Sequence, residues 1–323
     1  MRTSWFDSGD LICICSYLFW TDWGKHRIEK AGMDGSARQT IAETGIYWPN
    51  ALTLDYPTRQ VYWADAHFDY IGAMNYDGGA RRRVVGHPSV VHPFAITVYR
   101  NFLYFSDWTR HAVVKVEKFT GKEIKVLLQN LGQPMDVHVY HSARQPPASN
   151  PCKDNNCGCT QLCLIAPIPT RDCVCSCSIG YQLAEDKKSC NLQNTFLIYA
   201  RGMEIAGIPK EVNASGDAIS PLLGLGNAVG IDFDAKERMI YFSDIVKDNI
   251  SRVSLVDRKV EVLVKAVKNV DGLAVDWIGR NLYWTDANRH EVAVARLNGS
   301  FKKVLFDKDV ARPRAIVLHP SEG

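Results

Sequence analysis

Five aspartates recur along the chain, each at the end of a short aromatic motif. The motif reads FWTD, YWAD, YFSD, YFSD and YWTD, and its copies end at Asp22, Asp65, Asp107, Asp244 and Asp286. A set of carboxylates could bind a metal ion or perform acid–base chemistry. A catalytic group is needed once, however, whereas these aspartates occur once per repeat. We therefore expect each to accept backbone N–H groups of the adjoining repeat, with no metal or cofactor bound.

The spacing of these signatures defines a repeat of 42 or 43 residues, interrupted once by a gap of 137 residues. A second motif of the PNALTLD type precedes four of the five copies, and β-branched segments separated by Asp-Gly or Asn-Gly follow them. Such runs predict short strands joined by tight hairpins. Four strands in about forty residues are typical of a β-propeller blade. The chain is therefore predicted to be all-β.

Two further copies of the second motif, at 133–140 and 312–319, have no signature directly after them. We interpret them as first strands, and residues 17–43 and 196–222 as strands two to four of a blade. This count gives six blade equivalents, three on each side of a central segment, and makes 133–140 the first strand of the blade that continues at 196. Two open half-propellers and one closed six-bladed ring both fit it. Pairing of 312–319 with 17–23 would indicate the ring.

The central segment is rich in cysteine. Eight of the ten cysteines lie between Cys152 and Cys190, which predicts a disulfide-stapled module and an oxidising, extracytoplasmic compartment. A zinc site would need paired C-x2-C arms around a longer spacer, and the cysteine spacings do not provide them. Eight cysteines allow 105 pairings, so the residues alone leave the connectivity open.

Composition excludes some classes of protein. A net charge of +3 with no basic stripe gives no reason to expect nucleic acid as a partner. The one basic run, Arg81 to Arg83, is interpreted as a solvated hairpin edge, with a partner-docking patch as the alternative. Nucleophile-elbow, Walker and His-Glu-x-x-His motifs are absent from the sequence, so we expect no enzyme. A propeller lactonase would need convergent acids and a metal at the ring centre.

The start of the chain carries no repeat. The apolar run from Leu11 to Trp20 is about half the length that crosses a bilayer, and Asp7 and Asp10 stand where a signal peptide has basic residues. We expect neither a membrane span nor a signal peptide, and we interpret this start as the edge of a fragment.

Together these motifs resemble the ectodomain of low-density lipoprotein receptor-related proteins. The likeness rests on the five signatures with their PNALTLD-type partners, the ending QPMDVHVYHSARQP, the following NPC and the restart FLIYARGMEI. It implies class B (YWTD) repeats of a six-bladed β-propeller around an epidermal growth factor-like (EGF-like) module. The implied domains are a non-repeat edge at 1–16, the end of one propeller at 17–143, the EGF-like module at 152–190, and the start of the next propeller, or the other half of one ring, at 196–320.

The resemblance also implies a disulfide pattern. It pairs Cys152 with Cys163, Cys159 with Cys175, and Cys177 with Cys190. Cys157 and Cys173 are additional to the family's six cysteines and are left as a candidate fourth bridge. The stretch Ala148–Pro151 lacks the acidic residues that precede calcium-binding versions of the module, so no calcium is expected.

The function that the resemblance implies is the non-enzymatic extracellular part of a single-pass endocytic receptor, present at the cell surface and in endosomes. It would bind extracellular protein ligands, support their release at low pH, and make no direct membrane contact through this segment. The alternatives are a Wnt co-receptor-type signalling ectodomain, with Wnt-pathway ligands in place of lipoprotein-type ones, and a basement-membrane adhesion propeller.

His92 is the candidate pH switch, because it falls where the low-density lipoprotein receptor carries a histidine used in acid-triggered release. A plain blade-packing histidine is the alternative. The position of that receptor's other release histidine carries Asp69 here, and His67 and His111 are interpreted as loop residues. Candidate glycosylation sites are Asn213, Asn249 and Asn298, and the third is expected at an exposed Asn-Gly hairpin tip.

Overall fold

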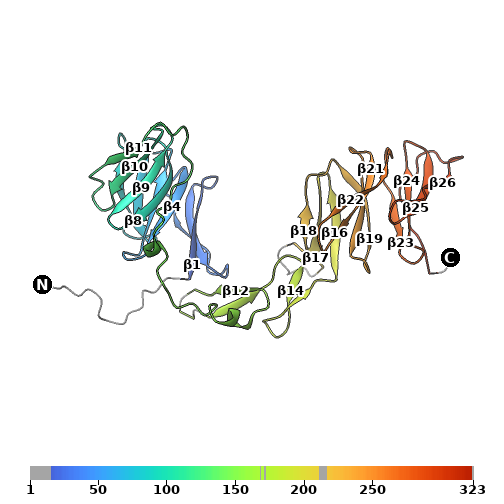
Figure 1. Ribbon diagram of the computed structural model, residues 1–323, viewed down its shortest axis with the longest axis horizontal. Coiled ribbons are helices and arrows are strands. Elements are labelled where there is room, and N and C mark those ends of the chain that lie inside the picture. The colour runs from blue at the N-terminus through green and yellow to red at the C-terminus, as the bar shows by residue number, and fades with distance from the viewer. Residues whose placement is uncertain (1–15, 168, 171, 211–216, 322–323) are drawn as a thin grey trace. The chain divides into compact units, whose positions relative to one another are not determined.

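The computed structural model describes residues 16–167, 169–170, 172–210 and 217–321. Within them the fold consists of antiparallel strands and two short 3-10 helices, and nearly every strand pairs with its neighbour in sequence. The chain divides into two compact units, residues 1–176 and 177–323. Figure 1 shows the elements of each unit in colours that follow the chain.

Three successive sheets form most of the first unit. The first has the order β1-β2-β3, with strands Tyr17–Asp22, Arg27–Gly32 and Gln39–Ala42. The second runs from β4 to β7, with strands Pro49–Asp55, Gln60–Asp65, Tyr70–Asn75 and Arg82–Gly86. The third runs from β8 to β11, with strands Pro93–Tyr99, Phe102–Asp107, Ala112–Glu117 and Lys125–Leu128. The four-stranded meander is the blade that the repeat predicted.

Small elements make up the cysteine-rich segment. The first unit ends with η1 (Ser142–Arg144), η2 (Asn155–Gly158) and the pair β12 (Leu162–Ile165) and β13 (Cys173–Ser176). The second unit begins with the pair β14 (Tyr181–Leu183) and β15 (Cys190–Leu192).

Three sheets follow in the second unit. The first is β16-β17-β18, with strands Phe196–Arg201, Glu204–Pro209 and Ile219–Leu222. The next runs from β19 to β22, with strands Ala228–Asp234, Met239–Asp244, Asn249–Ser254 and Val260–Lys265. The last runs from β23 to β26, with strands Leu273–Asp276, Asn281–Asp286, Glu291–Arg296 and Lys303–Phe306.

The prediction of an all-β fold with three blade equivalents on each side of a disulfide-rich module is confirmed. One part of the strand count was wrong: residues 133–140 and 312–319 belong to no strand. A strand is defined by its ladder of hydrogen bonds to a neighbour, and neither segment has such a ladder in the described sheets. The choice between two open half-propellers and one closed ring stays a prediction.

The two aromatic residues of a signature fill two different cores. Tyr62 packs in the cluster shared by the β4–β7 and β8–β11 sheets, whereas Trp63 packs in the cluster shared with the β1–β3 sheet. Tyr241 and Phe242 divide in the same way in the second unit. Successive side chains of a strand point to opposite faces, so an aromatic pair can hold its sheet against both neighbouring sheets.

The third residue of a signature connects one sheet to the next. The hydroxyl of Ser243 accepts the backbone N–H of Gly230, in the first strand of its own sheet, at 2.9 Å. It also donates to the carbonyl of Val270, ahead of β23, at 2.7 Å. Because Ser243 is buried, this hydroxyl satisfies two backbone groups that water cannot reach.

Equivalent hydroxyls bind the two segments that are not strands. Ser106 donates to the carbonyl of Met135 at 3.2 Å, and Thr285 donates to the carbonyl of Arg314. The signature that ends at Asp65 has Ala64 in this position, and there the side chain of Asn50 donates to the carbonyl of Pro93 at 3.3 Å. Residues 133–140 and 312–319 therefore accept the hydrogen bond from a signature hydroxyl, as the segment leading into a first strand does. They do not, however, pair with a second strand in the described sheets.

Replacing Ser243 with alanine tests this connection. The substitution leaves the Gly230 N–H and the Val270 carbonyl without their partner, which costs about 1–3 kcal/mol for buried groups. The expected result is a lower urea midpoint for Ser243→Ala, and a midpoint within error of the unmodified chain for Ser220→Ala, an exposed serine of β18. Equal midpoints for the two variants would contradict the proposed role.

Candidate binding site: a row of histidine and aromatic side chains

The buried carboxylate of Asp65 holds together two stretches of backbone. One oxygen accepts the N–H of Tyr47 at 2.7 Å, and the other accepts that of Trp48 at 3.3 Å, just ahead of β4. The second oxygen also accepts the N–H groups of His67 and Phe68 at 3.0 and 3.1 Å, in the turn after the signature. Four backbone donors thus converge on one side chain that is 0% exposed.

The other signature aspartates have the same arrangement to different degrees. Asp244 and Asp286 each accept four backbone N–H groups, those of Gly226, Asn227, Val246 and Lys247, and those of Lys268, Asn269, Asn288 and Arg289. Asp107 accepts the N–H of Val91 and that of Arg110. Asp22, whose sheet has no first strand within the described residues, accepts that of Lys25.

The source of these donors differs from the expectation. We expected donors from the adjoining blade, but they lie on the segment that enters the first strand of the same sheet and on the turn after the signature. The reason is that strands one and two are antiparallel neighbours, which places the start of one beside the end of the other. The arrangement uses the carboxylates as acceptors within each sheet.

The electrostatics of Asp244 follow from this geometry. Burial raises the pKa of its carboxyl, but hydrogen bonds from the backbone N–H groups of Gly226, Asn227, Lys247 and Val246 outweigh burial, so the pKa lies below its usual range. The charged form is favoured because every donor in the cluster points at it.

Near Asp65 and Asp107, a series of histidine and aromatic rings lies side by side. We call this series the histidine–aromatic row; its members are His26, Tyr47, Trp48, His67, Phe68, His92, Phe94 and Trp108. The ring-centroid distances along it are 4.3 Å for His26–Tyr47, 4.1 Å for Tyr47–His67, 5.1 Å for Trp48–His67, 6.4 Å for Trp48–His92, 5.5 Å for His92–Trp108 and 4.3 Å for Phe94–Trp108. Tyr47, Trp48 and Phe68 are 39%, 38% and 44% exposed, so the row is accessible to a partner.

His92, the candidate pH switch, lies within this row. Its ring stacks on Trp108, and its backbone N–H donates to the carboxylate of Asp69 at 3.0 Å. Its φ of 84° is unusual for a residue other than glycine. His92 is therefore half-buried, with its ring packed on Trp108 and its backbone held by Asp69.

Sequence reasoning missed a second pattern of histidines. His26, His111 and His290 each follow a signature aspartate by four residues and have a positive φ. The Nδ1 atom of each lies within hydrogen-bond distance of the carbonyl 21 residues further on, that of Tyr47, Gly132 and Ala311 respectively. The spacing Asp-x3-His was the available signal. His67 and His111 lie in turns, where the sequence placed them.

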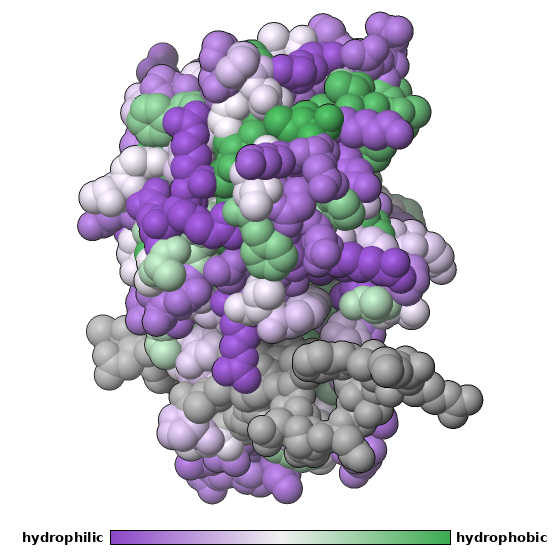
Figure 2. Space-filling view, turned by 90° about the vertical axis from the view of Figure 1, so that its left-hand side faces the viewer, coloured by the Kyte–Doolittle hydropathy of each residue, from purple (hydrophilic) through white to green (hydrophobic). Residues whose placement is uncertain are grey.

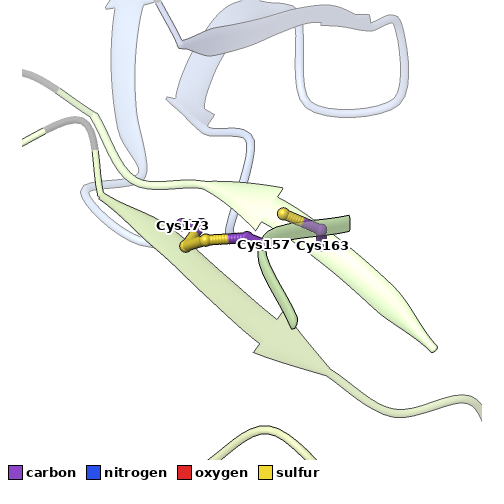
Figure 3. Close-up of side chains that lie close together, drawn as sticks. All are labelled: Cys157, Cys163 and Cys173. Carbon is purple, nitrogen blue, oxygen red and sulfur yellow. A yellow bond between two sulfur atoms is a disulfide. The ribbon is translucent and has the colours of Figure 1, made fainter. Parts of the chain in front are cut away.

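The cysteine module contains four disulfides in the structure. They join Cys152 to Cys163, Cys157 to Cys173, Cys159 to Cys175, and Cys177 to Cys190. Figure 3 shows Cys163 beside the Cys157–Cys173 bridge. Among the described residues these three cysteines are the group close enough to share a metal ion, but their sulfur atoms are engaged in disulfides.

Two candidate glycosylation sites lie in the described residues. Asn298 is exposed between β25 and β26, and its side-chain oxygen accepts hydrogen bonds from the backbone and hydroxyl of Ser300. Asn249 begins β21 and is less accessible. Asn213 lies outside the described residues.

Comparison with known proteins identifies the repeat. The family of low-density lipoprotein receptor repeat class B matches residues 16–56 and 280–320. The vitellogenin receptor of Solenopsis invicta is 32% identical over 324 residues, in a match that covers 95% of this chain. This is a chain of low-density lipoprotein receptor class B repeats. The class B repeats expected from the signatures are confirmed.

The class B chain spans 18% of the length of that vitellogenin receptor. Its structure is similar to part of the nidogen/laminin complex, with a TM-score of 0.35 and 17% identity over 95% of this chain and 82% of the other. For virginiamycin B lyase from Staphylococcus aureus the TM-score is 0.30, with 12% identity over 93% of this chain and 85% of the other. Values this low do not bear on function.

The surface of the class B chain is mostly polar on the face drawn in Figure 2, where hydrophobic residues gather in one group near the top. In the described part of the chain, no helix has the length and hydrophobicity needed to cross a bilayer.

The lowered pKa of Asp244 predicts how its contribution to stability changes with pH. A group whose pKa is lower in the folded state stabilises the fold above its unfolded pKa, and this contribution is lost as the pH falls through the folded value. We expect Asp244→Asn to lower the free energy of unfolding at pH 6 by about 1–3 kcal/mol. The deficit should shrink below pH ~4. Urea unfolding from pH 6 to pH 3 measures it, with Asp307→Asn, at an exposed position, as the control; a deficit independent of pH would refute the assignment.

The fourth disulfide can be tested chemically. The Cα atoms of Cys157 and Cys173 are 6.5 Å apart, within the range of a disulfide. Partial reduction at acid pH, alkylation and peptide mass mapping should yield a peptide pair joined through these two residues. A free thiol at Cys157, or its linkage to Cys163, would show a different connectivity.

Proposed function

We propose that the class B chain is the non-enzymatic extracellular part of an endocytic lipoprotein-receptor-related protein. Residues 17–143 and 196–320 would be propeller blades, 152–190 an EGF-like spacer and 1–16 a non-repeat edge. The observation that carries the proposal is the match to a vitellogenin receptor along 95% of this chain. A ligand of the vitellogenin type is the corresponding proposal for its partner.

The histidine–aromatic row supports a binding role at the first unit. Exposed Tyr47, Trp48 and Phe68 offer the large, stiff, amphipathic rings that are enriched in protein interfaces. Their backbone is fixed by Asp65, so they need little ordering when a partner binds. The five signature aspartates already accept hydrogen bonds from backbone N–H groups. This structural use of the carboxylates supports a binding role over a catalytic one.

Release at low pH is the finer part of the proposal. Histidine ordinarily gains a proton between neutral and endosomal pH. A proton on His92 would place a positive charge against the rings of Trp48 and Trp108. Such a charge would change the histidine–aromatic row that we propose a ligand contacts.

The proposal can be tested with purified vitellogenin as the probe, passed over the immobilised chain at pH 7.4 and pH 5.5. We expect binding at pH 7.4 and about tenfold weaker binding at pH 5.5. A tenfold ratio of the two dissociation constants corresponds to a loss of about 1.4 kcal/mol of binding free energy when His92 gains a charge. His92→Gln should retain binding at pH 7.4 and reduce the ratio at least threefold. His138→Gln, at an exposed histidine outside the row, should leave it unchanged.

Absence of vitellogenin binding at both pH values would contradict the receptor proposal for this segment. An unchanged ratio in His92→Gln would contradict the switch alone. A signalling or adhesion role would instead give a partner that binds equally at the two pH values.

A further inference from the structure

A second site is a pocket on the β4–β7 sheet that shares Phe68 with the histidine–aromatic row and is otherwise built by different side chains. Its volume is about 440 Å³, and its lining consists of Gly45, Trp63, Phe68, Tyr70, Arg81, Arg82 and Arg83. The pocket thus combines three aromatic rings with the guanidinium groups of Arg81 and Arg83, a composition that suits an anion with a hydrocarbon stem. The guanidinium of Arg82 instead lies over Tyr62 and donates to the carbonyls of Lys118 and Phe119.

The floor of the pocket is fixed by packing and hydrogen bonds. The indole N–H of Trp63 donates to the Tyr70 hydroxyl at 3.1 Å, and that hydroxyl donates to the carbonyl of Gly45 at 2.9 Å. Gly72 faces the indole, and a Cβ there would come within 2.2 Å of the ring. Absence of a side chain at Gly72 therefore allows Trp63 to lie against the strand.

The arginines stand over this floor. The guanidinium of Arg81 is 5.1 Å from the Trp63 ring centroid, and that of Arg83 is 5.3 Å from the Tyr70 ring centroid. This placement differs from the solvated hairpin edge that the sequence suggested, because cation–π contacts hold the side chains on the sheet.

The arginines bind neutral oxygens. Arg81 donates to the carbonyls of Thr44 and Gly45, and Arg83 donates to that of Asp69 at 3.4 Å. Among the ion pairs of the described residues, none includes Arg81, Arg82 or Arg83. Within the described residues, the charges of Arg81 and Arg83 are therefore not balanced by an ion pair, whereas Arg82 interacts electrostatically with Glu117.

Two other sheets show what balances the corresponding cation. In the β1–β3 sheet, Arg38 lies over Trp20 at 5.1 Å and pairs with Glu29 at 2.8 Å. Glu29 is the cross-strand partner of Trp20, and the cross-strand partner of Trp63 is Gly72. The β4–β7 sheet thus lacks a glutamate at this position.

In the β23–β26 sheet, Lys302 lies over Trp284 at 5.4 Å and pairs with Glu291 at 3.6 Å. Glu291 is the cross-strand partner of the signature aspartate Asp286. The corresponding partner of Asp65 is Tyr70, so the second glutamate position is also without a carboxylate. In both comparison sheets the chain itself supplies the carboxylate that the β4–β7 sheet lacks.

We propose that this pocket binds the carboxylate of a glutamate or aspartate side chain from an acidic segment of a protein ligand. The carboxylate would accept hydrogen bonds from Arg81 and Arg83, as Glu29 does from Arg38. Its methylene groups would lie on Trp63 and Tyr70. The repeat geometry favours a carboxylate over a sulfate-bearing glycan, because carboxylates already occupy the equivalent place in two sheets. This binding site shares Phe68 with the histidine–aromatic row, but its arginines lie outside the row and the proposal does not depend on release at low pH.

The test uses a fluorescein-labelled peptide of six glutamates and the whole chain at pH 7.4, with anisotropy as the readout. We expect saturable binding that weakens as sodium chloride is raised, and no binding of a six-glutamine peptide. Arg81→Gln with Arg83→Gln should weaken binding at least tenfold. Because Arg83 is exposed, Arg83→Gln alone should keep the fold, checked by its melting curve, and weaken binding at least threefold.

The matched control is Arg100→Gln, which removes an exposed guanidinium that lies 5.2 Å over the ring of Tyr99. It should bind the peptide within twofold of the unmodified chain. Equal loss in Arg100→Gln and Arg83→Gln would indicate general attraction to a basic surface and overturn the proposal. Binding of a heparin fragment in place of the glutamate peptide would overturn it as well.

Discussion

A buried carboxylate that accepts backbone N–H groups from two places at once is the interaction on which the four-stranded sheets depend. Asp65, Asp244 and Asp286 each join the segment that enters strand one to the turn that leaves strand two. Breaking this joint would leave several donors buried without partners. The same joint places Tyr47 and His67 next to one another, so the binding row is a consequence of how the sheet is closed.

The four positions of a signature have separate structural roles. The two aromatic residues fill the cores on either side of the sheet, the hydroxyl reaches the next sheet, and the carboxylate fixes the entry to its own sheet. These roles explain why the motif tolerates Phe for Trp and Ser for Thr but retains the acid. Where Ala64 replaces the hydroxyl, Asn50 makes a contact to the next sheet from another strand.

The sequence predicted the sheets well because their pairing is local: each hairpin joins neighbouring strands, and the spacing of the signatures fixes where they fall. It failed at 133–140 and 312–319, since an extended pattern becomes a strand only when a neighbour supplies the ladder. The histidine–aromatic row and the Arg81 pocket bring together rings and charges from different turns and strands. The unpaired arginines of the pocket result from Gly72 and Tyr70, which stand where two other sheets have Glu29 and Glu291. This difference becomes visible only when the sheets are compared in the structure.

The bond from Ser106 to the carbonyl of Met135 has a practical consequence for dividing the chain. Judged by strands, the β8–β11 sheet ends at Leu128, and a truncation there looks harmless. Such a cut would remove the acceptor of a buried hydroxyl and the carbonyl of Pro134 that holds the indole of Trp108. A stable boundary for expressing these sheets alone therefore lies beyond residue 140, and by the same reasoning the later sheets need the residues around Arg314.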